Sequence, residues 1–263
     1  MFFRLFEKDN KNGYYKLKET IVSSASKMHD YDKVMFVLHG WGAESQTYKS
    51  MFLDLLESVD AIVAIDFPGF GNEKIYRSFT LDDYADYLQS IIKLFCAKHI
   101  FFLCHSFGAR VFFVFYKKYF ECYSNMSKLI LMAPAGIKPR FSLIRFLKVK
   151  KYKHFAKKCK NNPKLCEKLS KYGSNDYKNI KSDILKNTFK NVVGVDASGF
   201  AACVKLPTII IWGTGDYDVK RHMVIKLNKL IAGSKLYIIK HAGHFPFLFD
   251  KAGVISIIKN FLM

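Results

Sequence analysis

Short apolar runs alternate with longer helical segments along most of the chain. The apolar runs are rich in β-branched and aromatic residues and occupy positions 34–38, 61–65, 100–103, 129–132, 208–212 and 235–239. Each run is short enough to be a strand buried on both faces of a sheet. The segments between them have the apolar spacing of amphipathic helices, at positions 47–58, 80–96, 107–119, 220–231 and 252–261. This alternation predicts an α/β fold in which crossover helices join parallel strands.

The alternation lapses once, before the fifth apolar run, for about seventy residues, which is far more than a single crossover requires. Helical signals within this interval lie at 141–157, at the pair Asn162-Pro163 and at 183–191. We therefore predict one domain with an insertion. Its α/β core comprises residues 1–135 and 201–263, and residues 136–200 form a small helical lid.

The chain is strongly basic, with a formal net charge of +20. Only six of its 42 basic residues are arginine, whereas specific phosphate and base recognition favours the bidentate arginine side chain. No recognisable nucleic-acid-binding module is present, so a nucleic-acid partner is not expected. Segment 138–190 carries 17 Lys or Arg against three acidic residues. We interpret it as a solvated basic surface, and the alternative is attraction of an anionic substrate or an acidic carrier protein.

Other features bear on location and on metal binding. No apolar run reaches the length of a membrane-spanning helix, and the apolar start of the chain meets charged residues from Glu7 onward, so we expect a cytoplasmic protein. The six cysteines lie far apart without a CxxC pair, and several fall inside apolar runs. This pattern favours reduced core thiols over a disulfide framework or a zinc site, and neither a metal nor a cofactor is expected.

A serine lies between the predicted strand at 100–103 and the predicted helix at 107–119. The local sequence is Leu-Cys-His-Ser-Phe-Gly-Ala-Arg, with the serine at position 106. A nucleophile elbow occupies such a strand-to-helix turn and requires small residues two positions before and after the serine. Gly108 satisfies this requirement, while Cys104 stands where glycine is usual. Ser106 is therefore the candidate nucleophile.

The first predicted parallel strand runs into His39-Gly40-Trp41-Gly42. The glycines permit a tight turn whose backbone amides point at one spot, as stabilisation of a tetrahedral oxyanion requires. The predicted donors are the backbone N–H groups of Trp41 and Phe107, the latter at the positive end of the helix after Ser106. The alternative interpretation is an ordinary glycine-containing turn.

Candidate acid and base residues follow the last two predicted strands. Asp216 lies in the loop after 208–212, and Asp218, two residues later, is the alternative acid. The run 235–239 leads to His241 and His244, and the Gly-His turn favours His244 as the base.

A further loop follows the strand at 61–65 and contains two glycines and a proline. It extends from Asp66 to Gly71. We interpret it as structural turn chemistry and assign Asp66 no catalytic role.

Ser106, Asp216 and His244 thus occur in the order serine, acid, histidine, each after a different predicted strand. Through these motifs the chain resembles the α/β-hydrolase superfamily over nearly its whole length. It is similar in particular to small bacterial serine hydrolases of undefined substrate. The resemblance implies a mostly parallel sheet of about eight strands flanked by helices, with the lid after the sixth strand. The residues expected to contact substrate are His39, Gly40, His105 and Phe245.

The activity expected from the resemblance is ester hydrolysis through an acyl-enzyme, on a small or medium acyl substrate. Three alternatives remain. One is hydrolysis of a carbon-carbon bond in dienoic diketo acids, although enzymes of that kind usually carry asparagine where this chain has His105. Another is release of an ester or thioester from an acyl carrier protein. The last is a ligand-binding protein that keeps the fold without catalysis.

Overall fold

The computed structural model describes residues 2–11, 14–22, 30–138 and 180–263, together with the single residues 147, 150, 154 and 177. Its strands are β1 (Phe3–Lys11), β2 (Tyr14–Val22), β3 (Asp30–Leu38), β4 (Ala61–Ile65), β5 (Cys96–His105), β6 (Met126–Met132), β7 (Thr208–Gly213) and β8 (Lys235–Ile239). They form one eight-stranded sheet in the order β2-β1-β4-β3-β5-β6-β7-β8. The strands from β4 to β8 pair in parallel, and β1 pairs antiparallel with both of its neighbours.

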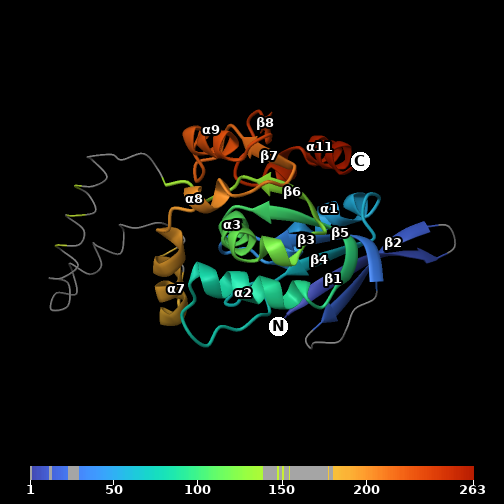
Figure 1. Cartoon of the computed structure of the whole chain (residues 1–263), viewed down its shortest axis with the longest axis horizontal. Coiled ribbons are helices and arrows are strands. Elements are labelled where there is room, and N and C mark those ends of the chain that lie inside the picture. The colour runs from blue at the N-terminus through green and yellow to red at the C-terminus, as the bar shows by residue number, and fades with distance from the viewer. Residues whose placement is uncertain are drawn as a thin grey trace.

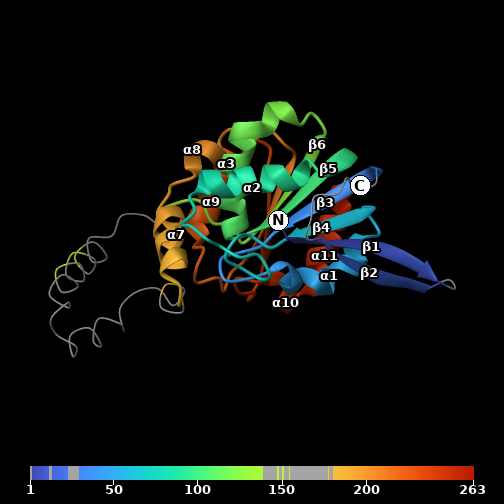
Figure 2. The ribbon, with the colours of Figure 1, turned by 90° about the horizontal axis from the view of Figure 1, so that it is seen from below.

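Helices cover both faces of this sheet (Figures 1 and 2). One face carries α2 (Leu81–Ile92), α3 (Phe107–Tyr119), α8 (Ser198–Ala201) and α9 (Arg221–Leu230). The other face carries α1 (Lys49–Leu55), α10 (Pro246–Phe249) and α11 (Lys251–Leu262). Short 3-10 turns, Ser45–Tyr48 and Phe120–Cys122, precede α1 and follow α3.

The two faces have separate apolar cores because successive strand residues point to opposite sides of a sheet. In β3, Phe36 packs with the core under α2 and α3, whereas Met35 and Val37 pack with the core under α1 and α11. Every residue of β4 and β7 is buried. Burial on both faces explains why these strands are continuous apolar runs in the sequence.

All six predicted parallel strands are present, and the helix predicted at 107–119 has the bounds of α3. The helix predicted at 80–96 is wrong at its end, because α2 stops at Ile92 and Cys96 already belongs to β5. Its start is fixed by a capping box, in which the Thr80 side chain accepts a hydrogen bond from the Asp83 N–H. The hairpin of β1 and β2 was not predicted as such from the apolar pattern.

Part of the predicted lid is described. The helical segment predicted at 183–191 is α7 (Asp183–Val193). It is tied to the segment before α2, where Phe79 N–H donates to Thr188 Oγ1 at 3.0 Å and the Asn191 side chain donates to Phe79 O at 3.2 Å. The helix predicted at 141–157 lies outside the described residues except for three helical positions, and the start predicted at Asn162 lies outside them as well.

Four of the six cysteines are described, and all four are unpaired. Cys104 is buried as expected for a core thiol, whereas Cys96 and Cys122 are exposed, so that expectation is wrong for these two. Cys159 and Cys166 lie outside the described residues. Over the described parts of the chain, no helix combines the length and the apolar character needed to cross a membrane.

Candidate active site

The predicted site residues lie in loops at one edge of the sheet, beyond the carboxyl ends of the parallel strands. His39 directly follows β3, and Ser106 directly follows β5. Asp216 follows β7, and His244 follows β8. Parallel strands present their carboxyl ends together, which is why this edge collects functional side chains in α/β folds.

Ser106 occupies a strained turn between β5 and α3. Its backbone has φ 47° and ψ −109°, a region that residues other than glycine rarely adopt. The turn requires close packing around it, because a Cβ on Gly108 would lie 2.4 Å from the carbonyl oxygen of Leu38. Cys104, which stands where glycine is usual in such turns, is fully buried in the sheet core. The cysteine is therefore accommodated.

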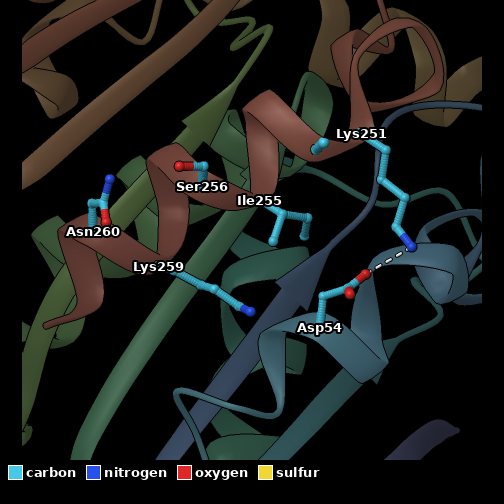
Figure 3. A pocket seen from close by; sticks show the side chains of 7 residues that line it. Asp54, Lys251, Ile255, Ser256, Lys259 and Asn260 are labelled. Atoms are coloured by element: carbon cyan, nitrogen blue, oxygen red, sulfur yellow. Dashed lines mark ion pairs between the residues drawn. The ribbon is translucent and has the colours of Figure 1, made fainter.

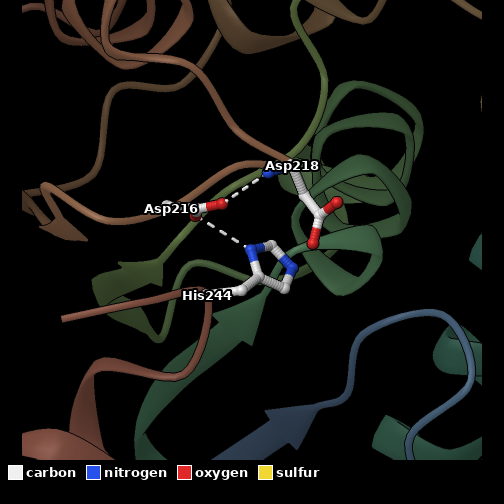
Figure 4. Close-up of side chains that lie close together, drawn as sticks. All are labelled: Asp216, Asp218 and His244. Carbon is white, nitrogen blue, oxygen red and sulfur yellow. Dashed lines mark hydrogen bonds and ion pairs between the residues drawn. The ribbon is translucent and has the colours of Figure 1, made fainter.

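His244 and Asp216 form a hydrogen-bonded pair (Figure 4). The distance from His244 Nδ1 to Asp216 Oδ2 is 2.9 Å, and the Asp216 side chain is fully buried while that of His244 is 18% exposed. Asp216 Oδ1 accepts hydrogen bonds from the backbone N–H groups of Asp218 at 2.8 Å and Val219 at 2.9 Å. Both carboxylate oxygens are thereby oriented. Nε2 is the imidazole nitrogen that is not bonded to Asp216.

The alternatives left open by the sequence separate in this geometry. Asp216 is the carboxylate bonded to His244, whereas Asp218 is exposed and contributes its backbone N–H. His241 is exposed and has a positive φ of 64° at the end of β8. Among the described residues no hydrogen bond joins Ser106 Oγ to His244 Nε2. Catalytic hydrogen bonds of this kind commonly tighten only when substrate is bound.

The turn after β3 lies against the serine turn. A Cβ on Gly40 would lie 3.3 Å from Ser106 Cβ, and the Trp41 and Phe107 rings are in edge contact at 5.5 Å. Within the described parts of the chain, neither the Trp41 N–H nor the Phe107 N–H donates a hydrogen bond. Two unsatisfied donors on adjacent turns, one of them at a helix N-terminus, suit the binding of a developing oxyanion.

His39 holds the peptide that links Gly40 to Trp41. Its Nδ1–H donates to Gly40 O at 2.7 Å, and its Nε2 accepts the Phe67 N–H at 3.0 Å. Both ring nitrogens are used, and burial lowers the pKa of this histidine to about 4, so the ring is neutral. The side chain is fully buried. Its predicted contact with substrate stays a prediction.

Tyr48, in the 3-10 turn before α1, contacts the turn after β3, which the sequence alone does not predict. Its buried hydroxyl oxygen accepts the Gly40 N–H at 3.2 Å. Together with the bond from His39, this contact fixes both sides of Gly40. The sole signal in the sequence is a tyrosine within a predicted helix, since a buried tyrosine usually places its hydroxyl on a polar partner.

Most of the chain matches a known protein family. Residues 29–250 match the family model Hydrolase_4, described as serine aminopeptidase, S33. The chain belongs to this family. The protein is a hydrolase with the α/β-hydrolase fold. No curated protein matches the chain in sequence.

Solved structures share the fold of this hydrolase at low sequence identity. The esterase EaEST from Exiguobacterium antarcticum has a TM-score of 0.68 and 16% identity, with 89% of this chain and 93% of that chain covered. A lipase-esterase related protein from Clostridium acetobutylicum has a TM-score of 0.64 and 17% identity, covering 90% and 100%. The meta-cleavage product hydrolase CumD from Pseudomonas fluorescens IP01 has a TM-score of 0.62 and 14% identity, covering 88% and 90%.

The structural role expected for Asp66 in this hydrolase agrees with its contacts. The carboxylate is fully buried and accepts the N–H groups of Ser45 at 2.7 Å and Asn72 at 3.1 Å. A Cβ on Gly71, where φ is 55°, would lie 2.3 Å from the same carboxylate. Asp66 therefore organises its own loop and joins it to the start of the 3-10 turn at Ser45.

The helix α7 reaches the site through aromatic contacts. Phe189 of α7 is in edge contact with the Trp41 ring at 5.0 Å, and Phe70 contacts the same ring at 4.8 Å. Tyr177 extends this row by a contact with Phe189 at 5.7 Å. Trp41, in the turn after β3, is thus covered by aromatic groups.

One group of side chains near the site could hold a metal ion. Asp216, Asp218 and His244 each present a ligand atom within 4.8 Å of the others, and Figure 4 shows the Asp218 carboxylate beside the imidazole. Oxygen and imidazole donors suit several divalent cations. The imidazole Nδ1, however, is already bonded to Asp216, so a cation coordinated there would displace that bond.

Two cavities lined by described residues lie away from the predicted site. One, of about 470 Å³, lies between α1 and α11 and includes the Lys251–Asp54 ion pair at 2.7 Å (Figure 3). Another, of about 520 Å³, lies along α9 and is lined in part by Lys138, Asp196 and Lys226. None of the predicted site residues of the hydrolase lines either cavity.

Proposed function

We propose that the protein is a serine hydrolase that cleaves carboxylic esters of small or medium acyl chain through an acyl-enzyme. Ser106 is the nucleophile, His244 the general base and Asp216 the acid that orients it. The observation that carries this proposal is the strained backbone of Ser106, with φ 47°. Such strain costs about 1–3 kcal/mol and persists where the surrounding structure imposes it, most often at functional sites.

In the acylation step, Ser106 Oγ attacks the ester carbonyl carbon while His244 Nε2 takes the hydroxyl proton. A serine hydroxyl is a weak nucleophile near neutral pH, so it needs this base within hydrogen-bond reach. The carbonyl oxygen gains negative charge and is held by the N–H groups of Trp41 and Phe107. The tetrahedral intermediate then collapses, the bond from carbon to the alcohol oxygen breaks, and His244 donates its proton to the leaving alcohol.

In the deacylation step, a water molecule replaces the alcohol. His244 takes a proton from the water, and the resulting hydroxide attacks the acyl carbon. The bond to Ser106 Oγ breaks, the serine recovers its proton from His244, and the free acid leaves. Both steps pass through a protonated His244, which the buried carboxylate of Asp216 stabilises through the 2.9 Å bond to Nδ1.

The test is labelling by a fluorophosphonate probe together with turnover of p-nitrophenyl esters of graded acyl length. Wild-type protein and a Ser256→Ala control, changed on the exposed face of α11, are expected to be labelled and to hydrolyse the shorter esters. Ser106→Ala is expected to lose both properties. Labelling or turnover that persists in Ser106→Ala would overturn the assignment of the nucleophile.

Parallel measurements with other substrates and with a carrier protein separate the remaining activities expected from the sequence. Cleavage of a dienoic diketo acid in preference to any ester would favour the carbon-carbon bond hydrolase. Binding to an acyl carrier protein that weakens with salt would favour the carrier as partner. Wild-type protein that is neither labelled nor active on any of these substrates would favour a ligand-binding role.

We also propose that residues 136–200 act as the lid of this site. The contact between Phe189 of α7 and Trp41, whose N–H is one of the proposed oxyanion donors, supports this division of the chain. Because the lid contributes aromatic rings next to the oxyanion donors, it is the segment expected to set acyl chain length. Phe189→Ala is expected to shift the preferred length of the p-nitrophenyl ester, and an unchanged preference would argue against the lid.

A further inference from the structure

His105 lies between the loops that carry the proposed catalytic groups. It precedes Ser106 in the chain, and its Nε2 is 2.9 Å from the backbone carbonyl oxygen of His244. The centroids of the His105 and His244 rings are 4.8 Å apart. On the opposite side, a Cβ on Gly40 would lie 2.7 Å from His105 Nδ1. One imidazole therefore lies against three segments: the turn that carries Ser106, the loop that carries His244 and the turn at Gly40.

The hydrogen-bonding state of His105 follows from its surroundings. The side chain is fully buried, and this burial lowers its pKa to about 3, with the charge of His244 acting in the same direction. The neutral ring carries a single N–H. Because a carbonyl oxygen can only accept, that hydrogen lies on Nε2 and is donated to His244 O. Nδ1 has no hydrogen-bond partner in the described parts of the chain.

Packing alone does not explain a histidine at this position. A buried nitrogen without a hydrogen-bond partner is unfavourable, and a phenylalanine would fill the same space without it. The neighbours are compatible with such an apolar ring, since Phe245 stacks on His105 at 4.6 Å and Tyr48 packs against it at 5.7 Å. The feature that a phenylalanine would lack is the hydrogen bond to the carbonyl of His244.

We infer that His105 is a positioning residue for His244, an inference that rests on the proposed function. The bond to His244 O fixes the backbone of the base, and the stack on Phe245 fixes the residue that follows it. The His244 side chain is then held from two directions, by His105 through its backbone and by Asp216 through Nδ1. Catalysis by a base requires such placement, because an error of about 1 Å costs about a hundredfold in rate.

The neutral state of His105 is part of this role. His244 carries a positive charge in each tetrahedral intermediate, and a second cationic ring 4.8 Å away would oppose that charge. With a pKa of about 3, His105 stays neutral near neutral pH. It donates its one hydrogen bond without competing for the proton that His244 transfers.

The test compares two substitutions of His105. His105→Phe keeps a ring for the stack on Phe245 but removes the donor, and His105→Gln keeps an amide N–H at the reach of Nε2. We expect His105→Phe to lower kcat about 10- to 100-fold while KM changes less than about twofold, since the loss is one of alignment. His105→Gln is expected to recover most of kcat. His99→Phe, at an exposed histidine of β5, is the control and is expected to match wild type.

Folding and catalysis are separated by two further measurements. Thermal unfolding reports whether each variant is folded, and the rate of fluorophosphonate labelling reports nucleophile activation without substrate turnover. If His105→Phe does not fold, His105→Asn replaces it, since its amide is too short to reach the carbonyl.

The possible outcomes have distinct meanings. If the variant without the bond to His244 O keeps the wild-type kcat and labelling rate, the role of His105 is overturned. Labelling of Ser106 would in that case leave the proposed function standing. Loss of kcat that His105→Gln does not restore would also overturn it. A wild-type protein that the probe does not label would overturn the proposed function, and the role of His105 with it.

Discussion

Two turns at the same edge of the sheet each hold a histidine through Nδ1, with different results. In His39 the second nitrogen, Nε2, is also bonded, because it accepts the Phe67 N–H. His39 donates from Nδ1 to a backbone carbonyl at 2.7 Å, and His244 bonds from Nδ1 to a carboxylate at 2.9 Å. His39 is fully buried, with a pKa lowered to about 4, whereas the His244 side chain is 18% exposed. A carbonyl partner fixes a neutral ring, while a charged partner also stabilises the protonated ring. The two rings therefore differ in environment: His39 is fully buried and neutral, whereas His244 lies beside a carboxylate.

The largest effect is expected from giving His244 an uncharged partner, as His39 has. Asp216→Asn keeps an oxygen for the N–H groups of Asp218 and Val219 but removes the charge beside His244. We expect kcat/KM to fall about 10⁴-fold, because the uncharged amide neither favours the needed tautomer nor stabilises the cation. Ester hydrolysis measures the loss. Asp218→Asn is the matched control, expected to change kcat/KM less than about threefold, and equal losses in the two variants would contradict the assignment of the acid.

The next effect concerns stability in acid and depends on the buried ring. The pKa of His39 lies near 4 in the folded protein and near 6.5 when the chain unfolds, so the unfolded state takes up the proton first. Stability from this group is complete above pH 6.5 and is lost as the pH falls toward 4, by about 3 kcal/mol. His105, with its pKa of about 3, acts in the same direction over a wider range.

Urea unfolding at pH 7, 5.5 and 4.5 measures this dependence. The free energy of unfolding of wild type is expected to fall steeply over this range, and that of His39→Gln less steeply because one buried titrating group is removed. His241→Gln, at an exposed position, should follow wild type. A slope unchanged by His39→Gln would show that the buried ring does not link folding to protons.

The smallest effect is expected at the Tyr48 hydroxyl, which bonds the turn after β3. Tyr48→Phe removes the acceptor of the Gly40 N–H, a bond of 3.2 Å, while keeping the buried ring. A single neutral hydrogen bond contributes about 1 kcal/mol, so we expect kcat to fall about fivefold with KM nearly constant. Tyr76→Phe, at an exposed tyrosine, is the control. A loss as large as that of Asp216→Asn would mean that the two turns depend on their supports equally.

Much of the fold was predictable from sequence because its central strands are buried on both faces. Runs such as 61–65 and 235–239 coincide with β4 and β8. The hairpin of β1 and β2 was missed because charged residues interrupt its apolar pattern. Arg4 and Glu19, which form an ion pair across its two strands, are fifteen residues apart in the chain. Their pairing depends on a register that the sequence does not display.

In the candidate site, the order of residues was predictable and their contacts were not. Ser106, Asp216 and His244 stand out because each follows a predicted strand. The choice between Asp216 and Asp218 depends on a turn in which one carboxylate accepts two following N–H groups. The contacts of His105 with His244 and of Tyr48 with Gly40 arise only when distant loops meet.

The close approach at Gly108 sets the separation of two turns. Because a Cβ there would lie 2.4 Å from Leu38 O, the start of α3 rests directly on the end of β3. Ser106 lies two residues before Gly108, and Gly40 lies two residues after Leu38. A side chain at position 108 would therefore push the turn that carries Ser106 away from the turn after β3.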